Sequence, residues 1–539
     1  MPTRRAWWSE RLKRFWDAFR TSFARWAVSA TMVLVIALGI VLRSRGYLFE
    51  RTLPLWLDEA DWAVSLLSRP LSDHLIRPLG FMAICKAIAT VFSPSEAALR
   101  FFSWFAGVGT TLLAPFLAQR LYRSAVARLF FVAILALHPG AIDLSREFKP
   151  YAVGLAVHLA MLFLVLRYVA TRRARDLALA LATIVPGVLF AQDVVFAYPA
   201  LFLVLAIEAL RERRFRHLLG IALSAVATIA LVLGLYLMVW SRLESSEANY
   251  WGKKYGVFHV EGKSKRSYTD WALAKYAEMT AVPGLRQTMW KSSEIPPKQI
   301  VELRELDGAF WFVLHLIGIL VIVWQRRWRE ALLLISPLAV MTLFNRLGFW
   351  PFGVFRTNLF IVAYFAAIAA MAFDPRRAIR VRLEALLPAV VLVIAPLLLF
   401  EQEWHRRKRW FAASSAMPSV VENIGALHAA RSDATEPELL VLDEHACPPW
   451  RYYTEYHPRF SREFAPDLRQ RFEVRCDEVN RNARRWVRRH LEQGHPRAWI
   501  LFAKARTYKR ATKGWLRGAR IKKTKLSGHW LVEVRKLKK

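Results

Sequence analysis

Long runs of apolar residues alternate with short polar loops through most of this 539-residue chain. The runs are mostly about 16–25 residues long, the length with which a helix crosses a hydrocarbon layer of roughly 30 Å. The pattern therefore predicts eleven membrane-spanning helices. They lie near Trp26–Leu42, Arg100–Leu121, Ala125–Ile142, Tyr151–Ala170, Leu177–Phe190, Val194–Leu210, Leu218–Trp240, Ala309–Trp324, Ala331–Leu347, Thr357–Phe373 and Ala385–Phe400.

The loops between these runs alternate in charge. Every second loop is rich in arginine: Arg120, Arg123 and Arg128; Arg172, Arg173 and Arg175; Arg211, Arg213, Arg214 and Arg216; Arg326, Arg327 and Arg329; Arg376, Arg377, Arg380 and Arg382. Because cytoplasmic loops carry the excess of Lys and Arg, we expect the N-terminus inside and the C-terminus outside. Phe81–Phe92 is too short to span and contains Lys86, so we interpret it as an interfacial or re-entrant helix. If this segment does span, the C-terminus lies inside.

Three longer polar segments face outward in this topology. They are Arg43–Leu99, Ser241–Gly308 and the tail from Glu403 to Lys539. We therefore expect a polytopic α-helical membrane domain over residues 1–402, with outer loops 43–99 and 241–308. The tail, residues 403–539, is long enough for a small α/β domain outside the cytoplasm.

Short apolar patterns predict the elements of the tail. Glu438–Leu442 and Ala498–Phe502 are continuous apolar runs typical of buried strands, and Trp530–Val534 alternates like an edge strand. Arg481–Leu491 has the pattern of a basic helix. No repeat of the two halves and no glycine-rich nucleotide loop is present in the sequence.

Composition narrows the class of protein and of partner. The chain is 55% hydrophobic, which is too apolar for an ordinary soluble enzyme, and its net charge is +36. The tail holds 31 Lys and Arg against 15 Asp and Glu, with nearly all the excess beyond Asn480. Nucleic acid does not fit a domain outside the membrane, whereas membrane lipids with anionic head groups or an anionic glycan do. A basic surface that only contacts solvent is the alternative.

The chain has three cysteines, two of which could form a disulfide. Cys447 and Cys476 both lie in the tail, where an oxidising compartment allows a disulfide. Spacing alone also allows two buried thiols. Cys85 lies in an apolar helix, where we expect it to pack, and no Cys/His spacing predicts a zinc site.

An acidic pair follows the first span. Asp58 and Glu59 stand in the sequence Leu55-Trp56-Leu57-Asp58-Glu59, with Asp61 close behind. Carboxylates held beside a bilayer are expensive and are typical of functional sites. One alternative is a helix N-terminus, whose dipole favours acids. The functional hypothesis is a general base that orients an acceptor hydroxyl or amine. A divalent cation near Asp58 and Glu59 is left open.

A second polar cluster stands at the outer end of the third span. The sequence Ser145-Arg146-Glu147-Phe148-Lys149-Pro150-Tyr151 offers two cations, a carboxylate and a phenol at the start of the next helix. Cations at this level suit a lipid phosphate, although Arg and Lys also extend toward the interface at many helix ends. A later outer loop, with Tyr250, Trp251, Lys253 and Lys254, suits either a sugar or an interfacial aromatic belt.

The order of these clusters resembles the polytopic GT-C glycosyltransferases. The resemblance is clearest over about residues 50–170 and is fainter over Trp350–Arg356 and Trp450–Tyr453. It is most similar to the branch that contains protein O-mannosyltransferases, lipid A aminoarabinose transferases and lipopolysaccharide galacturonosyltransferases. The resemblance implies a polyprenyl-phosphate-linked sugar donor that is used on the non-cytoplasmic face of a bacterial inner membrane.

The resemblance also implies roles for single residues. Asp58 falls at the position of the catalytic carboxylate, with Glu59 beside it. Arg146, Lys149 and Arg356 fall where cations approach the donor phosphate, and Glu147 and Tyr151 lie alongside as substrate-binding candidates. The family's His-Pro-Pro-Leu stretch is replaced here by Ile76-Arg77-Pro78-Leu79. The histidine of that stretch is missing here, and His74 and Arg77 are the nearby residues that we consider as substrate-binding candidates.

These observations predict an integral-membrane hexosyl- or pentosyltransferase of the cell envelope. Cations stabilise the leaving lipid phosphate, and a carboxylate on the opposite side of the sugar carbon orients the acceptor, so one displacement with inversion suffices. The acceptor is a lipid, a glycan or a protein. The alternatives are a transporter or flippase of a lipid-linked glycan, whose acids would lie mid-span, and a non-catalytic assembly protein with this fold.

Overall fold

The computed structural model divides the chain into two compact units. The described residues are 28–45, 47, 54–74, 77–238, 259, 267–280, 298–353, 356–374, 417–429, 437–463, 465–477, 482–503, 505–526 and 529–537. The helical unit comprises Met1–Arg45, Leu75–Phe81 and Ser103–Glu401, and the mixed unit comprises Gly46–His74, Met82–Phe102 and Gln402–Lys539. The first outer loop thus groups mainly with the tail rather than with the membrane helices. The predicted span Ala385–Phe400 and the aromatic loop residues Tyr250, Trp251, Lys253 and Lys254 lie outside the described residues.

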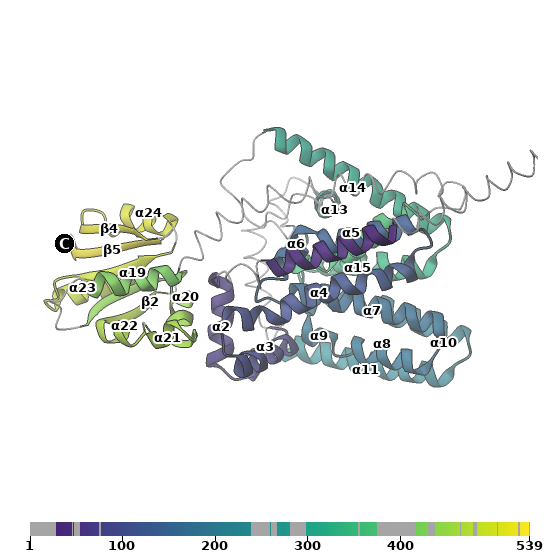
Figure 1. Cartoon of the computed structure of the whole chain (residues 1–539), viewed down its shortest axis with the longest axis horizontal. Helices are drawn as coiled ribbons and strands as arrows, with labels where there is room; N and C mark the ends of the chain where they lie inside the picture. The colour runs from purple at the N-terminus through teal and green to yellow at the C-terminus, as the bar shows by residue number, and fades with distance from the viewer. Residues whose placement is uncertain are drawn as a thin grey trace, which may run out of the picture. The chain divides into compact units, whose positions relative to one another are not determined.

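The helical unit is a bundle of apolar helices (Figure 1). An opening helix, Val28–Ser44, precedes α4 (Glu96–Leu121), α5 (Ala125–Leu137), α6 (Pro139–Leu144), α7 (Tyr151–Thr171), α8 (Ala174–Ile184), α9 (Gly187–Phe190), η3 (Gln192–Phe196), α10 (Tyr198–Arg211), α11 (Phe215–Met238), α13 (Tyr268–Thr280), α14 (Lys298–Trp324), α15 (Trp328–Arg346), η5 (Arg356–Asn358) and α16 (Ile361–Met371). The ten predicted spans that fall mainly on described residues coincide with these helices. The predicted polytopic α-helical class is confirmed.

Two predicted spans are interrupted rather than continuous. The run Leu177–Phe190 divides into α8 and α9 at Pro186, which has no N–H for a helical hydrogen bond. The run Ala125–Ile142 divides into α5 and α6 at His138, whose Nδ1 accepts a hydrogen bond from the Ala141 N–H at 3.1 Å. A hydropathy window does not register such breaks, because the flanking residues stay apolar.

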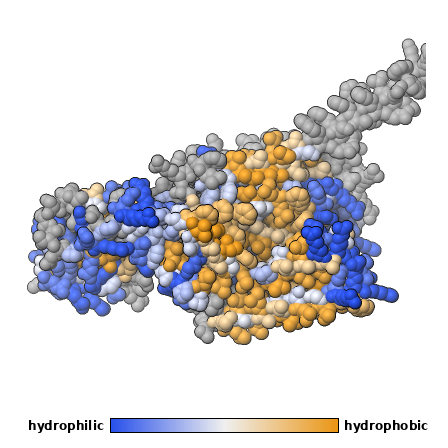
Figure 2. All heavy atoms as spheres, turned by 60° about the horizontal axis from the view of Figure 1, so that its bottom comes forward, coloured by the Kyte–Doolittle hydropathy of each residue, from blue (hydrophilic) through white to orange (hydrophobic). Residues whose placement is uncertain are grey.

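Apolar residues cover much of the face of this unit that Figure 2 shows. Among the described residues, α4, α7 and α11 are long and apolar enough to cross a membrane by length and composition. On α11, Leu223, Val226 and Ile229 are each more than 60% exposed, which in water would be an unusually large apolar patch. Such a surface suits lipid, and the protein is a multi-pass membrane protein.

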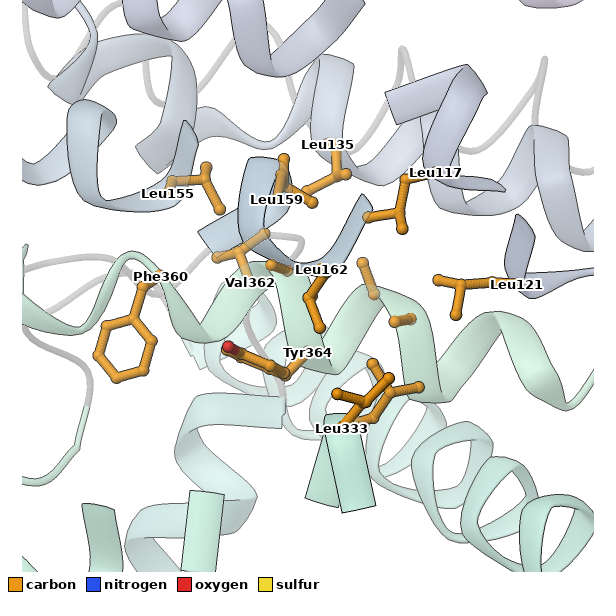
Figure 3. Packing of buried hydrophobic residues seen from close by; sticks show 14 of the residues in the cluster. Leu117, Leu121, Leu135, Leu155, Leu159, Leu162, Leu333, Phe360, Val362 and Tyr364 are labelled. Atoms are coloured by element: carbon orange, nitrogen blue, oxygen red, sulfur yellow. The ribbon is translucent and has the colours of Figure 1, made fainter. Parts of the chain in front are cut away.

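The core of the unit is a set of interlocking side chains. Leucines of α4, α5 and α7 meet Leu333 of α15 and the residues of α16 (Figure 3). Lipid tails are as apolar as leucine, so association depends on close packing rather than on removal of water. Gly318 of α14 provides such packing, because a Cβ there would stand only 1.9 Å from the Ile368 carbonyl oxygen of α16.

The basic loops of the unit converge on two buried carboxylates. Glu208 is ion-paired with Arg172, Arg211 and Arg329, which lie at the ends of three different helices, α7, α10 and α15. Asp374 accepts hydrogen bonds from the Ser124 N–H at 2.7 Å and from Arg327 at 2.9 Å. Arginine-rich loops that are far apart in the sequence therefore meet in shared ion-pair networks. This agrees with their alternation along the chain, while the cytoplasmic assignment of these loops stays a prediction.

The mixed unit combines short helices with one sheet. Its elements are α2 (Leu57–Ser68), η2 (Leu71–His74), most of α3 (Leu79–Phe92), the start of α4, α19 (Met417–Ala429), β1 (Glu438–Asp443), α20 (Cys447–Arg451), η6 (Tyr452–Tyr456), α21 (Phe460–Glu463), α22 (Ala465–Arg471), β2 (Phe472–Asp477), α23 (Ala483–Glu492), β3 (Ala498–Phe502), α24 (Ala505–Lys513), β4 (Arg520–Leu526) and β5 (His529–Lys536). The described part of the tail is thus α/β, as its sequence pattern predicts. The helix α3 has 14 residues, which agrees with a segment too short to span.

The sheet has the strand order β2-β1-β3-β5-β4. β1 pairs in parallel with β2 and β3, whereas β5 pairs antiparallel with β3 and β4. Leu439, Val441, Ile500 and Val532 belong to a core that also contains Val487 of α23. The strands β1 and β3 and the helix α23 were predicted correctly.

The prediction of an edge strand at Trp530–Val534 is wrong. β5 lies inside the sheet because β4 pairs with it along its other side. β4 reads Arg-Ile-Lys-Lys-Thr-Lys-Leu and is mostly exposed, so it is the true edge. Lysines on an edge strand discourage pairing with another chain, and the same lysines hide the strand from a search for apolar alternation.

The structure joins Cys447 of α20 to Cys476 of β2 by a disulfide, with a Cα–Cα distance of 5.6 Å. We expect both thiols to be oxidised in protein made in a membrane that faces an oxidising compartment. Peptide mass mapping without reduction checks this, with buried Cys85 as the internal example of a free thiol. Recovery of both residues as free thiols would contradict the prediction and favour a cytoplasmic tail.

Candidate functional site

The predicted catalytic carboxylates open the helix α2 of the mixed unit. The helix begins after Trp56, so Asp58 and Glu59 occupy its first turn, where the helix dipole favours negative charge. Glu59 also reaches back toward the Trp56 N–H at 3.4 Å, as an acid at the third helical position often does. Helix geometry alone therefore explains why acids occur here.

The surroundings separate the two acids. Glu59 is fully buried, and Arg100 of α4 holds it with two hydrogen bonds, Nε to Oε1 at 2.9 Å and Nη2 to Oε2 at 2.6 Å. Such a bidentate pair fixes both oxygens of a carboxylate. Asp58 is half-exposed and Asp61 is exposed. Of the first two acids, Asp58 is the one that solvent reaches.

Contacts from two other parts of the mixed unit reach the residues in front of α2. Arg100 Nη2 donates to the Pro54 carbonyl oxygen at 3.2 Å. The Leu55 N–H donates to the Tyr453 hydroxyl at 2.8 Å, and this hydroxyl donates to Glu96 Oε1 at 3.0 Å. His457 Nε2 lies 3.0 Å from Glu96 Oε2. Sequence reasoning did not find Arg100, Glu96, Tyr453 or His457 as parts of this arrangement.

The pKa of Tyr453 supports this hydrogen-bond direction. Burial first, and then the charge of Glu96, raise the pKa of the Tyr453 hydroxyl well above its usual range. The hydroxyl therefore keeps its proton at every physiological pH and can donate to Glu96.

His74 and Arg77, the candidates near the altered family motif, fall in different units. His74 is buried in the mixed unit, where its Nδ1 lies 3.4 Å from the Ser65 hydroxyl. Arg77 is half-buried in the helical unit.

The second cluster lies in the helical unit, in the loop between α6 and α7. Glu147 and Lys149 are 6% and 2% exposed, and Arg146 forms an ion pair with Asp143 of α6. The loop itself is fixed, because Ser103 Oγ donates to the Lys149 carbonyl oxygen at 2.8 Å. Phe148 stacks on Phe81 with ring centroids 5.8 Å apart.

Arg356 belongs to this second cluster. Its guanidinium carbon lies 5.8 Å from the centre of the Tyr151 ring, at the first residue of α7. The structure thus brings together four of the predicted residues, Arg146, Lys149, Tyr151 and Arg356, around one helix start. We call this group the α7 cluster.

The turn that carries Arg356 is held by a residue that sequence reasoning missed. Asn358 accepts from Trp350 Nε1 at 2.7 Å and donates to the carbonyl oxygens of Pro351 and Gly353 at 3.0 and 2.9 Å. Gly353 has φ +122°, a conformation that side chains rarely adopt.

A buried polar group also lies deeper in the bundle. His158 Nδ1 lies 2.7 Å from the Tyr364 hydroxyl, and His158 Nε2 lies 3.6 Å from Asp193 Oδ1. Gly154 makes room for the acid, because a Cβ there would stand 2.8 Å from Asp193 Oδ2. Hydropathy hides such residues, since single polar positions do not interrupt a long apolar run.

Within the described residues, no group of three or more His, Cys, Asp and Glu has the arrangement of a metal site. The idea of a cation near Asp58 and Glu59 therefore gains no support from a ligand cluster there. Arg100 already pairs with both carboxylate oxygens of Glu59.

Residues 76–240 match the model of the family described as dolichyl-phosphate-mannose-protein mannosyltransferase. The matched residues, less than half of the chain, are thus similar to a family of membrane glycosyltransferases. The match includes the whole loop from Ser145 to Tyr151, which confirms the resemblance seen in the sequence.

Two solved structures are also similar to the chain, both of ArnT from Cupriavidus metallidurans. The structure bound to undecaprenyl phosphate is 13% identical, covers 93% of this chain and 97% of that chain, and has a TM-score of 0.48. The apo structure is 15% identical, with coverages of 94% and 98% and a TM-score of 0.39. No curated protein sequence matches the chain.

Proposed function

We propose that this protein transfers a sugar from a polyprenyl-phosphate carrier to an acceptor on the non-cytoplasmic face of a bacterial inner membrane. The observation that carries the proposal is the α7 cluster, where cationic side chains gather at the start of one membrane helix. A polyprenyl phosphate presents its charge at this level of a bilayer. Cations there stabilise the charge that develops as the phosphate leaves.

Asp58 is the proposed base. Its carboxylate is half-exposed, whereas Glu59 is committed to Arg100. A carboxylate that orients an acceptor hydroxyl or amine must be reachable from outside, which favours Asp58 over its neighbour. Glu147, Tyr151, His74 and Arg77 remain candidates for contacts with the substrates. Inversion at the sugar carbon follows if one displacement completes the transfer.

Purified protein supplied with a polyprenyl-phosphate sugar and an extract of envelope glycolipids tests the proposal. The expected result is release of free polyprenyl phosphate together with a glycosylated acceptor, at a rate that depends on enzyme concentration. Movement of the intact lipid-linked sugar across a vesicle membrane without release would instead support a flippase. Comparison of glycolipids from wild-type and deletion strains then identifies the acceptor class.

The basic helix α23 gives a prediction about acceptor capture. Arg484, Arg485, Arg488 and Arg489 are all exposed on it. If the acceptor is an anionic lipid or glycan, these charges raise its local concentration without touching the chemical step. Replacing all four by glutamine should raise the apparent acceptor KM, leave kcat nearly unchanged and flatten the dependence on salt.

A matched control removes four exposed arginines from the predicted cytoplasmic loops: Arg120, Arg175, Arg213 and Arg216. This control changes the net charge equally and should leave acceptor KM as it was. If both sets behave alike, the basic surface of α23 has no role in capture.

A further inference from the structure

We propose that the C-terminal domain positions the catalytic carboxylate, through the hydrogen-bonded chain from His457 and Glu96 to Tyr453 and the backbone of Leu55. We call these four residues the tail clamp. The inference rests on the proposed role of Asp58 and adds a positioning function for the tail, which sequence reasoning treated only as a surface for an anionic acceptor.

The tail clamp joins segments that are far apart in the chain. Tyr453 and His457 lie on and just after η6, Glu96 is the first residue of α4, and Leu55 stands two residues before α2. All four belong to the mixed unit. The Tyr453 hydroxyl accepts from the Leu55 N–H and donates to Glu96, so one oxygen connects the backbone before α2 to a buried carboxylate.

Each member of the tail clamp has a buried polar atom that needs a partner. Leu55 and Tyr453 have no exposed surface, Glu96 is 8% exposed and His457 is 9% exposed. Buried polar groups without hydrogen bonds are costly, so the observed pairing is strongly preferred over any arrangement that breaks it. The Tyr452 hydroxyl adds a parallel contact to the Pro94 carbonyl oxygen at 2.9 Å.

The position of the Leu55 bond makes the clamp relevant to Asp58. The segment Pro54–Trp56 leads directly into the first turn of α2, and Asp58 lies in that turn. Arg100 holds the Pro54 carbonyl oxygen, and Tyr453 holds the next N–H. The backbone three residues before Asp58 is therefore tied from two sides, which limits how far the carboxylate can move. Misplacement of a catalytic group by about 1 Å is enough to cost a large factor in rate.

The clamp gives the tail domain a structural role at the start of α2. Without Tyr453, the Leu55 N–H would lack its partner, and the start of α2 would fray as helix ends do. The tail domain supplies this partner from a turn that the disulfide at Cys447 and the strand β1 help to hold. The domain thus supports the proposed active site, in addition to any role of α23 in acceptor capture.

Removal of the Tyr453 hydroxyl group from the full-length protein tests the clamp. In Tyr453→Phe, hydrogen exchange of a peptide covering Leu55–Ala60 should accelerate by about 3–10-fold, the factor expected for loss of one hydrogen bond. Exchange in α7 and α11 should not change. Tyr456→Phe, which removes a half-buried hydroxyl from the same turn, is the matched control and should leave the peptide unchanged.

Turnover distinguishes positioning from mere anchoring. Tyr453→Phe should lower kcat by about tenfold while donor KM stays the same, because ground-state binding is intact. Glu96→Gln should lose part of the activity, because Glu96 accepts from Tyr453 on one oxygen and from His457 on the other, and glutamine has only one oxygen. Glu96→Ala should match Tyr453→Phe. The double variant Tyr453→Phe with Glu96→Ala should be no worse than either single variant, as expected for residues in one chain of bonds.

Two results would overturn the proposal. Unchanged exchange at Leu55–Ala60 in Tyr453→Phe would show that the tail does not hold α2. Faster exchange with unchanged kcat would show that the clamp anchors the helix without positioning Asp58. If wild-type protein transfers no sugar, the proposed function fails, yet the exchange experiment still decides whether the tail holds α2.

Discussion

Asp58→Asn is expected to abolish sugar transfer while leaving expression, membrane insertion and folding intact. Asparagine has the shape of aspartate but cannot take a proton from an acceptor, and loss of a general base costs about 10²–10⁴-fold in rate. Asp58 is half-exposed, so the amide meets water rather than a dry core. Release of polyprenyl phosphate from a lipid-linked sugar, measured per mole of folded protein, provides the readout.

Glu59→Gln serves as the contrasting variant, because its neighbour has a different environment. Glu59 is buried against Arg100, and removing its charge leaves the guanidinium without its counter-ion. Breaking a buried ion pair costs about 3–5 kcal/mol, so this variant should lose folded protein rather than turnover per molecule. Near wild-type turnover in Asp58→Asn would reject Asp58 as the base.

The sequence predicted the membrane part of the fold well because hydropathy is a local property. A run of apolar residues reveals a span without knowledge of what it packs against. The errors arose where a single residue breaks a helix. Pro186 and His138 each divide a run that remains apolar on both sides. The small sheet was harder, because β4 is rich in lysine and takes its strand conformation from pairing with β5.

The site was predictable in part for the same reason. Motif order and residue type are local features, and they were enough to propose Asp58 and the residues of the α7 cluster, whose roles stay predictions. The partners Arg100, Glu96, Tyr453 and Asn358 were not predictable, because each acts through a contact formed by folding. Tyr453 is separated from Glu96 by 357 residues, and no local pattern reports such a contact. The different environments of Asp58 and Glu59 follow from these distant partners.

Lys149→Ala is expected to weaken use of the lipid-linked donor by tenfold or more. Lys149 is only 2% exposed, and Ser103 holds its carbonyl oxygen. A neighbouring cation therefore cannot easily take the place of its ammonium group. Charge-assisted hydrogen bonds contribute about 1.5–3 kcal/mol each, which corresponds to roughly 10–150-fold in binding. Initial rates over a range of donor concentrations, with acceptor saturating, measure the effect.

Lys149→Met separates the charge from the packing of the side chain. Methionine keeps an apolar stem of similar length, so the variant should fold like the wild type and still lose donor affinity as alanine does.

Arg356→Ala should weaken donor binding less than Lys149→Ala does. Arg356 is half-buried and its guanidinium lies over the Tyr151 ring, so the other cations of the cluster can partly compensate for the loss of its charge. A donor KM and kcat that stay unchanged in all three variants would mean that these cations only anchor helix ends. The phosphate-binding role of the α7 cluster would then be lost, and with it the main support for a polyprenyl-phosphate donor.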